Sequence, residues 1–331
     1  MQKSALQVLA VVLSVSASGL HAQQKPQLPG GYPNKPIRII VGAAPGGGSD
    51  TLARLTSAKL SDRWGNPVLV ENRASGVGGL VGMEFVSKAA PDGYTLMMAG
   101  SSSVMSSVFI IKTSFDVRKD FVPVAQLTAL PWVLSSPASL PVNSVKELIA
   151  YARSRPGQLN YASPGTGSAA HMGMELFNYL AGTKITHIPY KGTGPAMVDM
   201  MAGRVQMLLG TPIAVMPQAK AGKVKALAVT TARRSRLMPD VPTLMESGLA
   251  DFDVSGWLGI LAPAGTAPAV VQALNREYVQ ILNLPDVQAA LVADGSEPTP
   301  SSPEQFREAM MRELDRWDKV IKATNLKLDP E

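Results

Sequence analysis

The chain has 331 residues, contains no cysteine and carries a formal net charge of +6 from 31 basic and 25 acidic side chains. The absence of cysteine excludes disulfide bonds, thiolate metal sites and a cysteine nucleophile. Basic residues are dispersed and aromatic residues make up only 5% of the chain, so nucleic acid is not an expected partner.

The first 22 residues have the pattern of a secretory signal peptide. Lys3 supplies a positive start, residues 5–15 are almost wholly apolar, and small residues lead into Leu20-His21-Ala22. The apolar run is far shorter than the roughly 20 residues that a membrane-spanning helix needs. We therefore predict cleavage near Ala22 and a soluble product exported to the periplasm.

From residue 37 onward, short apolar runs alternate with helical patterns. In the first part of the chain the predicted elements are strands at 37–41, 68–70 and 94–99 and helices at 49–64 and 78–90. In the second part they are strands at 159–162, 186–189, 205–209 and 224–229 and helices at 144–155, 168–180, 195–202 and 215–221. A returning strand at 254–261 precedes helices at 267–282, 285–293 and 303–323.

Strands separated by helices of this length indicate βαβ units and a largely parallel sheet. About 300 residues remain after the signal peptide, enough for two cores. The predicted fold is α/β with two lobes around a ligand cleft. Lobe 1 is predicted to comprise residues 33–130 and 251–331, and lobe 2 residues 131–250.

A glycine-rich turn between a predicted strand and a helix is the most informative segment. It reads Ala44-Pro45-Gly46-Gly47-Gly48-Ser49-Asp50-Thr51. Glycines let the main chain approach a ligand closely, and the unpaired N–H groups at a helix start bind anions without a basic side chain. Alternatively, the glycines serve only a tight turn. The turn lacks the Gly-Lys-Ser/Thr of a Walker A loop, and Thr51 stands where a dinucleotide fingerprint needs its third glycine.

Two further small-residue segments follow strands in the same way. Ser163-Pro164-Gly165-Thr166-Gly167-Ser168 precedes a helix of the other predicted lobe, and Gly100-Ser101-Ser102-Ser103 follows the strand at 94–99. Ligands of open α/β sheets bind at the carboxyl ends of strands, where all three segments are expected. One such segment from each lobe could close on opposite ends of a dianion.

The residues predicted to contact the ligand are Gly46, Gly47, Gly48, Ser49, Asp50, Thr51, Ser101, Ser102, Ser103, Gly165, Thr166, Gly167, Ser168, His171, Tyr190 and Thr211. Tyr190 precedes two glycines and a helix, so cleft and surface positions both stay open for it. His171 and Glu175 share a helix face, but two ligands are too few for zinc. His187 is interpreted as an interior histidine.

The chain resembles the tripartite tricarboxylate transporter substrate-binding family, also called the Bug receptors. The resemblance spans nearly all of the predicted mature chain and is carried by a series of motifs in order. They are Tyr32-Pro33-Asn34-Lys35-Pro36-Ile37-Arg38, Ala44-Pro45-Gly46-Gly47-Gly48-Ser49-Asp50, Val70-Glu71-Asn72-Arg73, Ala90-Pro91-Asp92-Gly93-Tyr94-Thr95-Leu96, Leu159-Asn160-Tyr161-Ala162-Ser163, His187-Ile188-Pro189-Tyr190-Lys191-Gly192, Ala226-Leu227-Ala228-Val229-Thr230, Asp240-Val241-Pro242-Thr243 and Ala262-Pro263-Ala264-Gly265-Thr266.

Membership implies a type II periplasmic-binding-protein fold, a small carboxylate as ligand, and delivery to a transporter with one large and one small integral membrane subunit. Many members carry an acidic residue after the strand that corresponds to 205–209, which can read an amino or hydroxyl group. Here the chain reads Leu208-Leu209-Gly210-Thr211-Pro212 without a carboxylate. The departure favours a plain carboxylate or an aromatic acid over an amino acid.

We predict a monomeric receptor with no catalytic residue, no metal and no cofactor. A sensor or interaction protein uncoupled from transport is the alternative from another class. A serine hydrolase is disfavoured, because no G-x-S-x-G elbow occurs and histidines are scarce.

Overall fold

The computed structural model describes residues 31–46, 48–73, 79–163, 165, 168–190 and 192–324. The predicted signal peptide and three predicted ligand residues, Gly47, Thr166 and Gly167, lie outside the described residues. Within the part of the chain that is described, no helix combines the length and apolar character needed to span a membrane.

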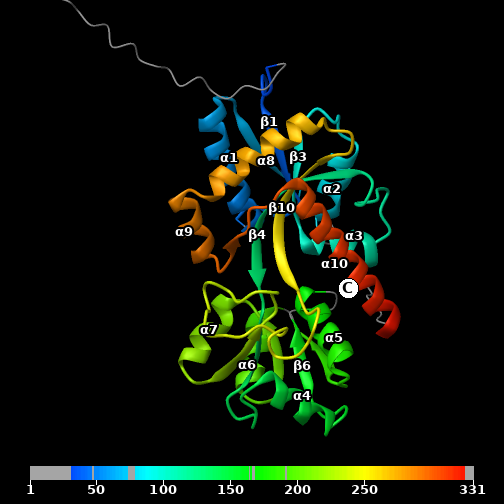
Figure 1. The fold of residues 1–331 in the computed structure, drawn as a ribbon, viewed down its shortest axis with the longest axis vertical. Coiled ribbons are helices and arrows are strands. Elements are labelled where there is room, and N and C mark those ends of the chain that lie inside the picture. Colours follow the sequence, from blue (N-terminus) through cyan, green and yellow to red (C-terminus); the bar gives the residue numbers. More distant parts are fainter. Residues whose placement is uncertain are drawn as a thin grey trace, which may run out of the picture.

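Two β-sheets, each covered by helices, lie one above the other along the long axis of the molecule (Figure 1). We call the part built on the six-stranded sheet lobe 1 and the part built on the five-stranded sheet lobe 2. The strand order is β11-β4-β10-β3-β1-β2 in lobe 1 and β7-β6-β8-β5-β9 in lobe 2.

Lobe 1 combines the beginning and the end of the chain. Its strands are β1 (Ile37–Val41), β2 (Val68–Asn72), β3 (Thr95–Gly100), β4 (Phe121–Pro131), β10 (Ser255–Pro263) and β11 (Glu297–Pro298). Its helices are α1 (Gly48–Trp64), α2 (Leu80–Ser87), α3 (Ser101–Phe109), α8 (Pro268–Leu282), α9 (Pro285–Ala293) and α10 (Pro303–Thr324).

Lobe 2 is formed by the middle of the chain. Its strands are β5 (Val133–Pro137), β6 (Asn160–Ser163), β7 (Thr186–Pro189), β8 (Met207–Gly210) and β9 (Val224–Val229). Its helices are α4 (Val145–Arg153), α5 (Ala169–Ala181), α6 (Thr193–Met201) and α7 (Pro212–Lys220). Ser144 caps α4, because its hydroxyl accepts a hydrogen bond from the Glu147 amide.

Both sheets are mixed, which corrects the expectation of a largely parallel sheet. In lobe 1, β1 runs parallel to β2 and β3, whereas β10 is antiparallel to both β3 and β4. In lobe 2, β6 is parallel to β7 and β8, and β5 is antiparallel to β8 and β9. The antiparallel pairs arise because the chain leaves lobe 1 through β4 and returns through β10.

The two crossings between the lobes lie side by side. The Thr230 amide donates to the Trp132 carbonyl (3.0 Å), and the Val254 amide donates to the Thr230 carbonyl (2.9 Å). The Trp132 amide in turn donates to the Thr230 hydroxyl (3.0 Å). We propose these crossings as the lobe boundaries that the sequence analysis put near residues 131 and 250.

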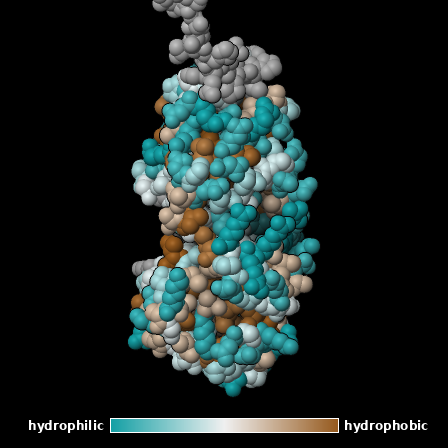
Figure 2. Space-filling model, turned by 60° about the vertical axis from the view of Figure 1, so that its left-hand side comes forward, coloured by the Kyte–Doolittle hydropathy of each residue, from teal (hydrophilic) through white to brown (hydrophobic). Residues whose placement is uncertain are grey.

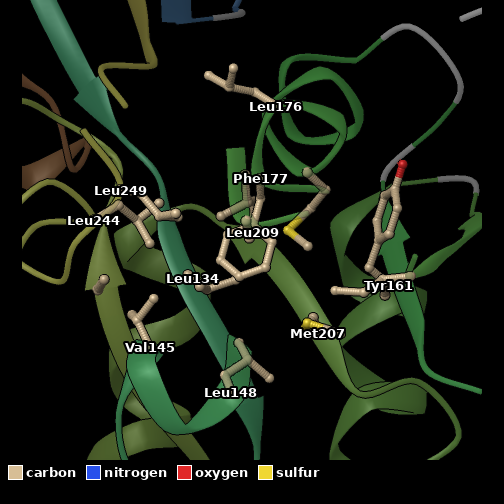
Figure 3. Close-up of a cluster of buried hydrophobic side chains, with 14 of the residues drawn as sticks. Leu134, Val145, Leu148, Tyr161, Leu176, Phe177, Met207, Leu209, Leu244 and Leu249 are labelled. Atoms are coloured by element: carbon tan, nitrogen blue, oxygen red, sulfur yellow. The ribbon is translucent and has the colours of Figure 1, made fainter. Parts of the chain in front are cut away.

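Apolar side chains fill both faces of each sheet. In lobe 1, one face packs against α1, α8 and α9 and the other against α2, α3 and α10. In lobe 2, α4 and α5 cover one face and α6 and α7 the other. Figure 3 shows the α4 and α5 side, where Phe177, Leu209 and Leu134 pack together and Tyr161 stands at the border with its hydroxyl pointing away from them.

Helix α10 packs on both lobes. Met310 and Leu314 belong to the core of lobe 1, whereas Trp317 and Val320 belong to the core of lobe 2. At the junction, the Trp257 indole donates a hydrogen bond to the Glu313 carboxylate (2.7 Å). Any movement of one lobe against the other therefore involves α10 as well as the two crossings.

Candidate functional site

The start of α1 is held by a buried carboxylate. Asp50 is only 2% exposed, and its carboxylate accepts hydrogen bonds from the Gly46 amide (2.9 Å), Arg54 (3.0 Å) and Asn72 (2.8 Å). Gly46 has a φ of +86°, which favours glycine at this turn. These contacts let Asp50 shape the turn, and its predicted contact with a ligand stays a prediction. Gly48 and Thr51 are exposed, and Ser49 is half-buried.

Replacing Asp50 with asparagine is expected to lower the free energy of unfolding by about 1–2 kcal/mol at neutral pH. The hydrogen bond from Arg54, aided by Gly46 and Asn72, lowers the pKa of Asp50 from 3.8 to about 2. A carboxyl with a lowered pKa stabilises the fold above its unfolded pKa and loses that contribution as the pH falls through the folded value.

Urea unfolding of wild type and D50N between about pH 7 and pH 2.5 checks this expectation. The difference in unfolding free energy should be complete above about pH 5 and shrink steadily below pH 4. A difference that does not change with pH would show that the ionised form of Asp50 contributes nothing.

The start of α3 presents serines. Of the small-residue segment at 100–103, Ser101 to Ser103 form the first turn of α3, a helix that the sequence pattern does not predict. Glycine occupies the cap position at residue 100, so no side chain caps the first amides of the helix. Ser101 and Ser103 are buried and Ser102 is exposed. The Ser101 hydroxyl accepts a weak hydrogen bond from the Trp257 amide (3.4 Å).

In lobe 2, the start of α5 is capped by Ser168, whose hydroxyl accepts a hydrogen bond from the His171 amide (3.2 Å). Ser163 fixes the preceding turn, because its hydroxyl donates to the Gly165 carbonyl (2.9 Å) and accepts from the Gly165 amide (3.2 Å). The same hydroxyl lies 2.7 Å from His187 Nε2. Since serine has one O–H, His187 must donate from Nε2 in this arrangement.

Three aromatic side chains pack against one another next to this turn. The ring centroids of His171 and His187 are 4.0 Å apart, and the Tyr161 ring lies 5.0 Å from His187 and 6.3 Å from His171. The Tyr161 hydroxyl donates to Glu175. Burial lowers the pKa of both histidines to about 4, so both rings are uncharged at neutral pH. Among the described residues no three His, Cys, Asp or Glu side chains form a metal-binding group.

Residues at the starts of α3 and α5 line a common cavity of about 20 Å³, which is about the size of one water molecule in this arrangement of the lobes. Ser101 and Ser102 of α3 line it from lobe 1, and Ala169 and Met172 of α5 line it from lobe 2. Met105 of α3, Val254 and Ser255 of the second crossing, and Glu313 and Trp317 of α10 complete the lining. Neither lysine nor arginine is among these residues. Glu313 brings a carboxyl group, whose pKa is raised by burial and which accepts hydrogen bonds from the Trp257 and Trp317 indoles.

The two lobes also come close to each other at the start of α7. Thr211 occupies its cap position and Pro212 its first turn, and Thr211 is half-buried. A Cβ placed on Gly295, which follows α9, would lie 3.0 Å from the Ile213 side chain. Ile213 of α7 and Val292 of α9 are exposed. Figure 2 shows apolar side chains gathered at the narrow waist on the α7 and α9 side.

Tyr190 lies beside the turn that precedes α5, where its carbonyl oxygen is 3.9 Å from the position that a Cβ on Gly165 would take. Its hydroxyl donates to Asp199 (2.8 Å) and its amide donates to the Ser163 carbonyl (2.9 Å). Burial raises the pKa of the Tyr190 hydroxyl, so it stays protonated. Its described contacts support the turn after β6.

Sequence reasoning did not single out Ser163, which ends β6, or Asp294, which is distant in sequence from every predicted site residue.

The family model for the tripartite tricarboxylate transporter family receptor matches residues 52–326. Protein BugT of Bordetella pertussis is 38% identical over 299 residues, which cover 90% of this chain and 91% of that protein. A ligand-free TctC solute binding protein from Polaromonas is 26% identical with a TM-score of 0.81, covering 88% of this chain and 99% of that one.

Two solved structures with ligands are also similar. MatC (Rpa3494) from Rhodopseudomonas palustris, with bound malate, is 33% identical with a TM-score of 0.66, covering 88% of this chain and 100% of that one. Rpa4515 of R. palustris, with adipate, is 34% identical with a TM-score of 0.68, covering 88% and 97%.

Proposed function

This chain belongs to the tripartite tricarboxylate transporter receptor family, and from that premise we propose that it is a periplasmic receptor that binds a small organic carboxylate and passes it to a membrane transporter of this type. One observation supports the proposal above all others. The uncapped start of α3 in lobe 1 and the start of α5 in lobe 2 line one cavity.

The chemistry of these helix starts suits a carboxylate. The first amides of a helix have no partner within it and carry the positive end of its dipole, so they bind an anion without a basic side chain. Serine hydroxyls at α3 add donors. The malate and adipate bound by two relatives carry a carboxylate at each end. We propose a ligand of this class, or an aromatic acid, held at its ends by the two lobes.

The lobes are proposed to close on the ligand. The structure is more similar to the ligand-free Polaromonas protein than to the two ligand-bound relatives, although its sequence is less similar to that protein. This supports an open arrangement of the lobes. A ligand that contacts both lobes only when they are closed would shift the population toward the closed form.

A thermal-shift screen of ligand-stripped protein tests the proposal. The panel contains aliphatic dicarboxylates, tricarboxylates and aromatic acids, with the matching amides as uncharged controls. At a hundredfold excess over Kd a ligand adds about 2.7 kcal/mol to the folded state, which raises Tm by about 4 °C in a chain of this size. Small-angle scattering should show a smaller radius of gyration with the same ligand. A panel in which no carboxylate acts more strongly than its amide would contradict the proposal.

Delivery to a transporter is a separate part of the proposal and needs its own test. Uptake of the radiolabelled acid identified in the screen should fall in cells lacking this receptor and return when the gene is restored. Unchanged uptake would favour the sensor alternative.

A further inference from the structure

A second and larger pocket lies at the junction of the lobes, beside α10. Its volume is about 250 Å³, compared with about 20 Å³ for the cavity between α3 and α5. Helix α10, which runs from lobe 1 toward α5 of lobe 2 (Figure 1), forms one wall, and β4, β10 and the segments next to the two crossings form the others. We call it the junction pocket, and its polar lining includes Gln126, Thr231, Asp253, Thr299, Arg312 and Arg316.

Two arginines of α10 line the junction pocket. Arg312 and Arg316 are four residues apart, so they lie on the same face of the helix. Arg316 is half-buried and donates to the Asp253 carbonyl, and it takes part in no ion pair with a described residue. Arg312 has a long contact with Glu308 (3.4 Å), in which both side chains are exposed. Two like charges at this spacing repel each other, so an anion between them would relieve the repulsion.

The two acids of the junction pocket do not neutralise these arginines. Glu313 accepts hydrogen bonds from two indoles, one of them at 2.7 Å. Asp253 is exposed, and its Oδ1 atom accepts a hydrogen bond from the Ala232 amide (3.1 Å). Neither acid forms an ion pair with either arginine. The guanidinium groups therefore keep donors for a bound molecule.

The rest of the lining suits a small and polar molecule. Gln126 of β4, Thr231 after β9 and Thr299 after β11 bring an amide and two hydroxyls to the junction pocket. Such groups can donate to anion oxygens that a guanidinium leaves free. Phe306 and Met310 also belong to the lining, but each is only 1% exposed. The junction pocket thus offers charge and hydrogen bonds, and little apolar surface.

We propose that the junction pocket is a second binding site, for a small anion whose carboxylate or phosphate oxygens contact Arg312 and Arg316. A planar guanidinium can donate two parallel hydrogen bonds to either group, and such charge-assisted bonds are strong. This site goes beyond the proposed function, because it lies outside the cavity between α3 and α5. Ser255 and Glu313 line both spaces and separate one from the other.

The same arginines also border an open groove between α5 and α10, so the test must distinguish the groove from the junction pocket. Lys319 lines the groove and not the junction pocket, whereas Ala309 lines the junction pocket and not the groove. K319A removes a positive charge of the same helix from the groove. A309L keeps every charge and fills part of the junction pocket. The two variants therefore report on different places.

Isothermal titration at low ionic strength with two probes, citrate and pyrophosphate, tests the proposal. At least one probe should bind to the wild type, and its Kd should rise by at least about 100-fold in the R312A/R316A double variant, since each hydrogen-bonded charge pair contributes about 10-fold or more. A309L should weaken the same binding by about 10-fold, and K319A should change it by less than about 3-fold. Arginine-dependent binding of citrate identifies a carboxylate site, and that of pyrophosphate a phosphate site.

Three results would overturn the assignment. They are no binding of either probe up to about 10 mM, binding that R312A/R316A leaves unchanged, and binding that K319A weakens as much as the double variant while A309L binds normally. Tm values from calorimetry show that a loss of binding is not a loss of fold. The proposed function is tested separately, because none of these substitutions lies at the start of α3 or α5 and citrate bound there would be insensitive to R312A/R316A.

Discussion

Replacing Gly48 with leucine is expected to raise the Kd for a carboxylate ligand by at least about 100-fold while leaving the fold intact. Gly48 is exposed at the start of α1, and a Cβ there would meet only Asp294 Oδ2 at an ordinary contact distance of 3.7 Å. The leucine side chain can therefore be accommodated by the protein. It would cover the first amides of α1, which the glycine-rich turn before this helix predicts as further donors to the ligand.

Calorimetric titration gives the Kd and differential scanning calorimetry gives Tm. The matched control is A58L, which places the same side chain on an exposed position of the same helix away from its start. G48L and A58L should have Tm values within about 2 °C of wild type, since surface substitutions change stability by about 0.5 kcal/mol or less. Normal binding by G48L would show that the glycines at α1 serve the turn alone.

The family and the fold class follow from the sequence and are confirmed by the comparisons and by the two α/β lobes. Apolar patterning finds β1 at its observed bounds and α1 within one residue, because β1 is a nearly continuous apolar run buried on both faces of its sheet and α1 buries one face. It does not find β4. Two prolines, Pro123 and Pro131, make this segment look unlike a strand in the sequence. In the structure β11 pairs with β4 only at Thr128 and Ala129. The edge of β4 that faces β11 therefore needs no N–H donor near Pro123.

Some parts of the candidate site could likewise be predicted from the sequence, and others could not. The glycine turns before α1 and α5 are visible in sequence because glycine and a capping residue signal a helix start. The start of α3 is less visible, since serines at 101–103 are weak helix formers and favour loops. Asp294 carries no local signal, because only the tertiary fold brings the end of α9 to the start of α1. The ligand roles of the residues first singled out stay predictions.

The second large effect is expected from replacing Gly42 with alanine, which adds a single methyl group. Gly42 follows β1, and a Cβ on it would lie 2.7 Å from both the Cα and the carbonyl oxygen of Gly79, the cap of α2. Both partners are backbone, so no flexible side chain can move aside. G42A must therefore push the start of α2 away from the end of β1 and disturb the chain that leads to Gly46.

Overpacking of this kind costs about 1–3 kcal/mol, and a clash between two backbone segments lies at the upper end of this range. The Tm of G42A should therefore fall by about 4–5 °C. Carboxylate binding should weaken by about 10-fold or more, because the turn at the start of α1 shifts with it. The matched control is G194A, where a Cβ meets nothing within 4 Å and a helix gains an alanine. Calorimetry of both variants should find G194A at least as stable as wild type. A G42A protein with wild-type Tm and affinity would mean that the close backbone contact between β1 and α2 neither limits stability nor positions the binding turn.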